Sequence, residues 1–136
     1  MRKSLIGIAA LVALGGCSAG ADVALGEAEI AKFHAALNAS QLDAIYSTAD
    51  PAFHKAAKPE EFNQLLSAVQ RKLGPYQSGK TATWVDNATT GGRFLTINYA
   101  SQYSRGAAQE NFVYRLANGQ ARLVGYHINS TALIVN

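Results

Sequence analysis

The sequence predicts an α+β domain in which N-terminal helices pack on one four-stranded antiparallel sheet. Apolar residues recur at helical spacing in the first half of the chain. After Gly79 they recur at every second position, which is typical of a strand. Turn signals containing glycine then separate four stretches of alternating character. About 120 residues follow the N-terminal signal, enough for one core and too few for two domains.

Three helices are expected in the first half. The first covers residues 27–38, in which one stripe recurs at helical spacing: Ile30, Phe33, His34 and Leu37. A short second helix follows, with Ser40 and Asp43 as its capping box. The third covers residues 59–73, because a proline suits its first turn and a Gly-Pro pair follows its last.

Four strands are expected in the second half, over residues 81–87, 93–103, 109–116 and 121–130. The pairs that separate them are Gly91-Gly92, Arg105-Gly106 and Asn118-Gly119. An Asn-Gly pair is the clearest hairpin signal, because both residues adopt the positive φ that a type I′ turn requires. The last three strands should therefore form a meander.

Two patterns in these strands carry a family resemblance: Tyr99-Ala-Ser-Gln-Tyr103 leading to Glu110-Asn-Phe-Val-Tyr114, and the closing Leu123-Val-Gly-Tyr126-His-Ile128. With the order of elements, they make residues 27–129 resemble small exported proteins of Gram-negative bacteria. Those proteins are grouped as domains of unknown function and have a cystatin-like or nuclear-transport-factor-two-like fold. The resemblance implies a curved sheet wrapped around helices, forming a cone with an apolar pocket. It implies no activity, because this fold hosts enzymes, binding modules and dimerisation modules.

Hairpin loops of two residues would place Ser101, Glu110 and His127 side by side on one face of the sheet. A hydrolytic triad needs the imidazole between the nucleophile and the acid, whereas here the carboxylate lies in the middle. The favoured interpretation is a cross-strand cluster of hydrogen bonds that satisfies polar groups near the core.

Two alternatives remain open for this polar cluster. Glu110 could act as a general base in an apolar pocket, where burial would raise its pKa, although no electrophilic partner is identified. A β-bulge at residues 118–120 would instead turn Val124, Tyr126 and Ile128 inward. His127 would then point outward, away from Ser101 and Glu110.

The implied pocket would be lined by the residues that face it from the helices and the sheet: Phe33, His34, Leu37, Phe62, Leu66, Tyr99 and Phe112. A metal site is not expected, because the three histidines lack ligand spacing and the chain has one cysteine. No cofactor is expected either, because no glycine motif that could cradle a phosphate precedes a helix.

The N-terminus is typical of a bacterial lipoprotein signal peptide over residues 1–16. Arg2 and Lys3 precede an apolar segment, and Leu14-Gly15-Gly16 before Cys17 matches a lipobox. By resemblance to bacterial lipoproteins, the Cys17 thiol would carry a diacylglycerol and its amine a third acyl chain such as palmitate, which together anchor stably. The alternative is an ordinary signal peptide with an incidental cysteine.

Cys17 is the only cysteine, so no intramolecular disulfide can form. Ser18 in the next position favours the periplasmic face of the outer membrane over retention in the inner membrane. Residues 17–25 are expected to form a lipidated N-terminus and flexible tether, and residues 26–136 the single domain. Without Arg2 and Lys3, ten basic residues face nine acidic ones. Because the basic residues are dispersed, nucleic acid is excluded as a partner.

The leading functional hypothesis is a non-enzymatic, membrane-anchored module that binds another protein through its sheet or the mouth of its cone. One form is an immunity protein that neutralises a toxin of the cell envelope, and a homodimer is left open. A carrier or sensor of a small apolar ligand in the pocket is the first alternative. An isomerase-like or hydrolase-like enzyme using Glu110 is the second.

Overall fold

A computed structural model describes residues 18–135, so the predicted signal peptide and Cys17 lie outside the described residues. The helices are α1 (Ser18–Asn38), α2 (Leu42–Ser47), α3 (Pro51–Ala56), α4 (Pro59–Leu73) and α5 (Thr131–Val135). The strands are β1 (Tyr76–Thr89), β2 (Gly92–Tyr103), β3 (Gly106–Ala117) and β4 (Gln120–Asn129). The predicted α+β class, with N-terminal helices packed on a four-stranded antiparallel sheet, is confirmed.

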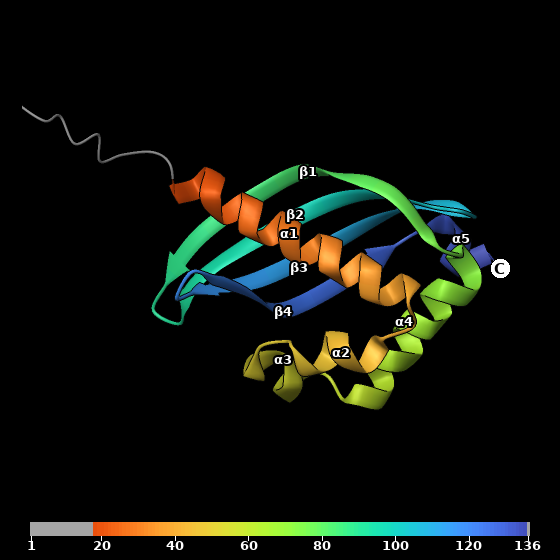
Figure 1. Cartoon of the computed structure of the whole chain (residues 1–136), viewed down its shortest axis with the longest axis horizontal. Helices are drawn as coiled ribbons and strands as arrows, with labels where there is room; N and C mark the ends of the chain where they lie inside the picture. The colour runs from red at the N-terminus through yellow and green to blue at the C-terminus, as the bar shows by residue number, and fades with distance from the viewer. Residues whose placement is uncertain (1–17, 136) are drawn as a thin grey trace, which may run out of the picture.

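The sheet is a simple antiparallel meander in the order β1-β2-β3-β4. Figure 1 shows it as a curved layer with α1 lying across one face and α2 and α3 beside β4. We call the face that packs on α1 the inner face and the opposite one the outer face. The core lies between α1, α4 and the inner face, where Leu37, Leu66 and Phe112 are at most 1% exposed.

Helix α4 has the predicted bounds, Pro59–Leu73. Apolar residues at helical spacing bury one face of it, including Phe62, Leu66 and Val69. Gly74 ends the helix with a φ of 73°, a conformation that costs glycine little. The local sequence predicts this helix correctly because the apolar stripe and the Gly-Pro stop signal indicate the same end.

Helix α1 begins at Ser18, nine positions before the expected start at Glu27. Residues 18–25, expected as a flexible tether, therefore form its first two turns. Val23 and Leu25 pack against the core. Gly26 lies so close to the sheet that an added Cβ would stand 2.6 Å from Ile97 Cδ1. Contact with the sheet thus stabilises a segment whose small residues gave no apolar stripe.

The connection between α1 and α4 differs from the expectation. Ser40 has a φ of 57° and is not an N-cap, and Gln41 precedes α2 without a side-chain cap. Helix α3, which was not predicted, is capped by the Asp50 carboxylate, which accepts a 2.9 Å hydrogen bond from the backbone N–H of Ala52. The Asp50 N–H in turn donates to the carbonyl of Leu123, which joins this connection to β4.

The β3–β4 turn is as predicted, with positive φ at Asn118 and Gly119. The β2–β3 turn lies one residue earlier than expected, at Ser104-Arg105, because Tyr103 pairs with Gly106. The Arg105 N–H donates to the carbonyl of Leu73, and its Nε donates to the carbonyl of Lys72 at 3.3 Å. The turn is therefore positioned by the unpaired carbonyls at the end of α4, which the local sequence does not reveal.

A β-bulge changes the second half of β4. Tyr114 pairs with Leu123, but Val113 pairs with Gly125, so Val124 is an extra residue. Leu123 and Tyr126 are three positions apart and both are buried, which the extra residue makes possible. The bulge that the sequence left open thus exists, although it lies at Val124 rather than at residues 118–120.

Candidate functional site

The candidate site centres on Glu110, a carboxylate on the inner face of β3 that is 1% exposed. The displaced β2–β3 turn shifts the pairing, so that Tyr99 rather than Ser101 stands opposite Glu110. Both Ser101 and Glu110 still face inward, and the Ser101 hydroxyl donates a hydrogen bond diagonally to Glu110 Oε1. The predicted contact between these two side chains is therefore present.

Three further side chains donate to the same carboxylate. His34 Nε2, on α1, donates to Oε1 at 2.8 Å. The hydroxyl groups of Tyr103 on β2 and Tyr126 on β4 donate to Oε2, at 3.1 Å and 2.5 Å. We call these five residues, His34, Ser101, Tyr103, Glu110 and Tyr126, the Glu110 cluster. Each carboxylate oxygen has two donors, as a buried carboxylate requires.

The pKa of Glu110 reflects two opposed influences. Burial raises the pKa of this carboxyl. The hydrogen bond and charge of His34 lower it, and so do the hydrogen bonds from Ser101 and Tyr126. The net result is a pKa below the ordinary value of 4.5. The pKa values of Tyr103 and Tyr126 are raised, first by burial and then by the Glu110 charge. At neutral pH the cluster is therefore an ionised acceptor surrounded by neutral phenol donors.

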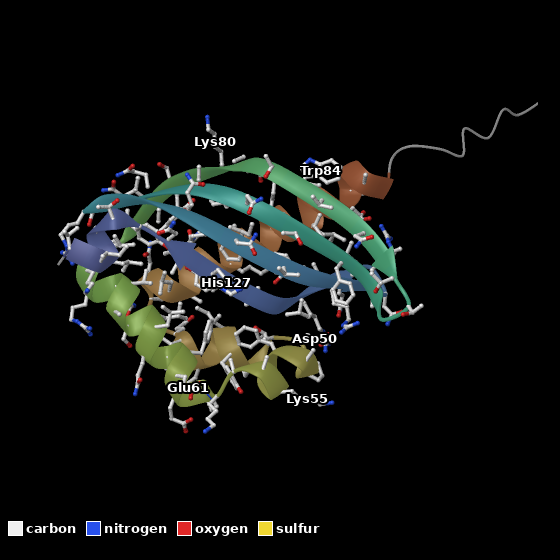
Figure 2. The ribbon with its side chains drawn as sticks, turned by 180° about the vertical axis from the view of Figure 1, so that it is seen from behind. Asp50, Lys55, Glu61, Lys80, Trp84 and His127 are labelled. Carbon is white, nitrogen blue, oxygen red and sulfur yellow. The ribbon has the colours of Figure 1, made fainter. Side chains whose placement is uncertain are left out.

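The prediction that His127 belongs to this cluster is wrong. The bulge at Val124 turns Tyr126 inward and leaves His127 exposed on the outer face, which Figure 2 shows from behind. The imidazole comes instead from His34, which was expected only as a pocket residue. A signal for this was present, because a histidine inside the apolar stripe of a helix needs a buried polar partner.

The geometry of the cluster is poorly suited to nucleophilic catalysis. Ser101 and His34 both bind Glu110 Oε1, so the carboxylate lies between them and the imidazole is not placed to take the serine proton. The His34 ring also stacks flat on Tyr76, with ring centroids 3.6 Å apart. The Glu110 side chain has no exposed surface. A substrate in solution would have no direct access to it.

The predicted apolar pocket is filled by its own lining. Leu37, Leu66 and Phe112 are part of the closed core, and Phe62 is 5% exposed. Tyr99 is half-buried, and its hydroxyl lies 3.1 Å from that of Tyr76. Aromatic and aliphatic side chains from α1, α4 and the sheet meet there directly. Of the seven expected residues, Phe33 alone among the described residues lines the cleft described next.

A cleft of about 280 Å³ lies between α1, α2 and the inner face of β3 and β4. We call it the α1–α2 cleft. Its lining residues come from all four elements and from the turn after α2: Glu29, Lys32, Phe33, Ala36, Ala44, Ile45, Thr48, Tyr114, Ala121 and Leu123. Phe33, Ile45 and Leu123 give it an apolar floor. Glu29 and Lys32, joined by a 2.8 Å ion pair, give it a charged rim.

Tyr114 adds a hydrogen-bonding group to this cleft. Its side chain is 2% exposed, and no side chain of residues 18–135 hydrogen bonds to its hydroxyl. Burial, followed by the charges of Glu29 and Glu110, raises its pKa well above the ordinary value of 10.0. The hydroxyl is therefore neutral and can donate to an occupant of the cleft.

A family comparison covers both sites. Residues 30–126, more than half of the chain, match the family described as a protein of unknown function (DUF4019). The chain belongs to the DUF4019 family. The match includes the whole Glu110 cluster and every lining residue of the α1–α2 cleft except Glu29. A comparison with curated proteins found no match, and neither did a comparison with solved structures.

The outer face of this DUF4019 domain is mainly polar where its strands are longest. Asn98 donates to Thr83 at 2.8 Å, and Asn111 donates to Asn98 at 2.7 Å, which makes a hydrogen-bonded ladder across three strands. His127 pairs with Asn111 and continues the row on β4. An apolar docking surface, expected if the open sheet face bound a protein, is not what this part of the sheet offers.

Two further features of the described residues concern the membrane and metal ions. Within residues 18–135, no helix has the length and apolar character needed to cross a bilayer. The same residues hold no group of three or more histidine, cysteine or acidic side chains placed to bind a metal ion.

Proposed function

We propose that this DUF4019 protein is a lipid-anchored, non-enzymatic binding module that takes an apolar side chain of a protein partner into the α1–α2 cleft. The cleft carries the proposal. It joins an apolar floor to a charged rim and to the hydroxyl of Tyr114, which no other described side chain engages; a mainly apolar lining with a few polar groups is the composition of a binding site. An apolar anchor that fills such a pocket commonly dominates the energy of a protein interface.

The size of the cleft favours a protein partner. Its volume is about 280 Å³, whereas pockets for drug-sized ligands start at about 300 Å³ and extend to about 1,000 Å³. A cleft at the lower limit suits one or two side chains better than a lipid or a large metabolite. The partner would supply the rest of the contact area around the rim.

The closed Glu110 cluster supports a role without catalysis. A general base must reach the proton that it removes, directly or through one water. Both oxygens of Glu110 are already held by protein donors, and a lowered pKa makes the carboxylate a weaker base. An isomerase-like mechanism with Glu110 as the base would require this cluster to open.

The location is proposed from the N-terminal sequence. The lipobox before Cys17 supports attachment to the periplasmic face of the outer membrane in a Gram-negative bacterium. The curved sheet around α1 is consistent with the proposed cystatin-like or nuclear-transport-factor-two-like kinship. Cys17→Ser should release the protein from the membrane fraction, and continued membrane association of this variant would contradict lipid anchoring.

A protein that neutralises a toxin of the cell envelope is one concrete form of this function. Such an immunity protein needs a membrane tether, a small fold and a binding site rather than chemistry. Co-purification with a secreted envelope-degrading enzyme would support this form.

The test is affinity capture with the full chain from the producing bacterium, read by mass spectrometry, with two matched variants. Ala44→Trp fills the cleft from α2, where Ala44 is exposed. Ala31→Trp adds the same side chain to an exposed position of α1 outside the cleft. We expect a stoichiometric protein that is lost with Ala44→Trp and retained with Ala31→Trp. Equal capture by both variants would contradict a binding role for the cleft.

A carrier or sensor of a small apolar ligand is the second candidate, favoured by a cleft that Tyr114 lines together with Phe33, Ile45 and Leu123. Native mass spectrometry of the purified protein distinguishes the two. A bound small molecule that Ala44→Trp displaces, with no captured protein, would favour the carrier.

A further inference from the structure

The edge strand β1 exposes two large apolar side chains next to each other. Trp84 is 44% exposed and Val85 is 59% exposed. Neighbouring residues of a strand point to opposite faces, so the pair flanks the edge of the sheet on both sides. Strand β1 pairs with β2 alone among the described strands, so this edge also carries unpaired backbone groups.

These side chains lie close to the start of α1. Trp84 pairs with Ile97 on β2, and Ile97 packs against Gly26 of α1. Asp22 forms an ion pair with Arg93, which also binds Asp86 at 2.9 Å. Figure 2 shows Trp84 on β1 beside the first turns of α1. From Ser18 to Gly26 the helix rises about 12 Å, so Trp84 lies within a short distance of the first residue of α1.

Cys17, the proposed site of lipid attachment, immediately precedes this helix. Because α1 begins at Ser18 and packs on the sheet from Val23 onward, the described residues that follow Cys17 contain no flexible tether. A lipid on Cys17 would then hold the part of the domain nearest to the start of α1 close to the membrane. Tryptophan, like tyrosine, is enriched at the headgroup level of bilayers, and Lys80 on the same strand suits anionic lipid headgroups.

We propose that the β1 edge around Trp84 and Val85 rests on the surface of the bilayer in which the Cys17 lipid is inserted. This inference rests on the lipid anchor of the proposed function and adds a fixed orientation. With β1 on the bilayer, the β4 side of the sheet, where α2 and the α1–α2 cleft lie, is directed away from the membrane toward a partner (Figure 1).

A second copy of the chain is a less suitable occupant of this edge. The register of β1 with β2 is interrupted between Thr81 and Thr83, so a bulge bends the strand. Lys80 and Asp86 place charges on either side of the apolar pair. Bulges and charges at an edge strand both oppose pairing between sheets, while a bilayer surface tolerates them.

Trp84 is the only tryptophan of the chain, so its fluorescence reports on this edge alone. The test uses the full-length lipidated protein, extracted from membranes and reconstituted into vesicles of phosphatidylethanolamine and phosphatidylglycerol. Vesicles with brominated acyl chains are compared with unbrominated ones. Because the ring should lie at the headgroup level, we expect emission about twofold lower in brominated vesicles and a shift to shorter wavelength.

The matched control moves the tryptophan to the other end of the molecule. The double variant Trp84→Phe/Ile134→Trp places it at an 80% exposed position of α5, a helix that lies at the other end of the molecule from the start of α1 (Figure 1). This variant should show no quenching. Unquenched Trp84 in protein that floats with the vesicles, or equal quenching in both proteins, would overturn the orientation and leave the anchor intact. Failure to float would overturn the anchor itself, and the orientation with it.

Discussion

The Glu110 cluster and the α1–α2 cleft are built by the same elements and have opposite properties. His34 binds Glu110, while the preceding residue, Phe33, lines the cleft. On β3, each carboxylate oxygen of Glu110 accepts from two donors, while the Tyr114 hydroxyl has no side-chain partner within residues 18–135. The Glu110 side chain has no exposed surface, whereas the α1–α2 cleft has room for an occupant. Accessibility, rather than residue type, therefore directs the functional proposal to the cleft.

The largest loss of stability among these variants is expected for Glu110→Gln. It removes the acceptor charge that four donors surround, and we expect the free energy of unfolding to fall by about 3 kcal/mol, as for other broken buried pairs. Urea denaturation measures it. The control is Gln109→Ala, an exposed neighbour on the outer face, which should change little. If Glu110→Gln kept full stability, the cluster would not be structural and a catalytic role would have to be reconsidered.

The difference in stability between the wild type and Glu110→Gln should depend on pH. The pKa of Glu110 is lower in the folded protein than in the unfolded chain, so its contribution is present above the unfolded value, near 4.5. The contribution is lost as the pH falls through the lower, folded value. The stability gap between wild type and Glu110→Gln should thus be widest at neutral pH and shrink below pH 4.5. A gap that widened on acidification would mean that the folded pKa is raised.

A pair of identical substitutions compares the two regions directly. Tyr126→Phe removes a 2.5 Å hydrogen bond to the Glu110 carboxylate, and Tyr114→Phe removes a hydroxyl without a partner among the described residues. We expect a loss of about 2 kcal/mol for the first and of about 0.5 kcal/mol or less for the second. Thermal or urea unfolding of both variants measures this. Similar losses would mean that the cleft is as tightly constrained as the cluster.

The sequence predicts the elements of this fold better than their contacts. The predictions of helix α4 and of the Asn118-Gly119 turn were correct, because each element is determined by residues within it or directly beside it. The early start of α1 depends on the packing of Gly26 against β2, which is distant in the sequence. The shifted β2–β3 turn depends on the end of α4 in the same way.

The candidate site shows the same limit. Ser101 and Glu110 could be placed together despite the error in the position of the β2–β3 turn. Moving a two-residue turn by one position shifts the pairing of the strands by two residues, so each side chain stays on the same face of the sheet. His127 could not be placed, because the bulge at Val124 reverses every later residue of β4. The cleft is formed where two helices meet two strands, and no local sequence pattern predicts which elements meet there.

The central claim is that the cleft binds and the cluster only supports the fold. Its most direct test is the affinity of the captured partner for Glu110→Gln and for Ala44→Trp, measured by calorimetry under conditions where both variants are folded. Glu110→Gln should bind like the wild type, and Ala44→Trp should bind about 100-fold or more weakly, as expected when a central anchor is blocked. Full binding by Ala44→Trp, with binding lost in folded Glu110→Gln, would contradict the account.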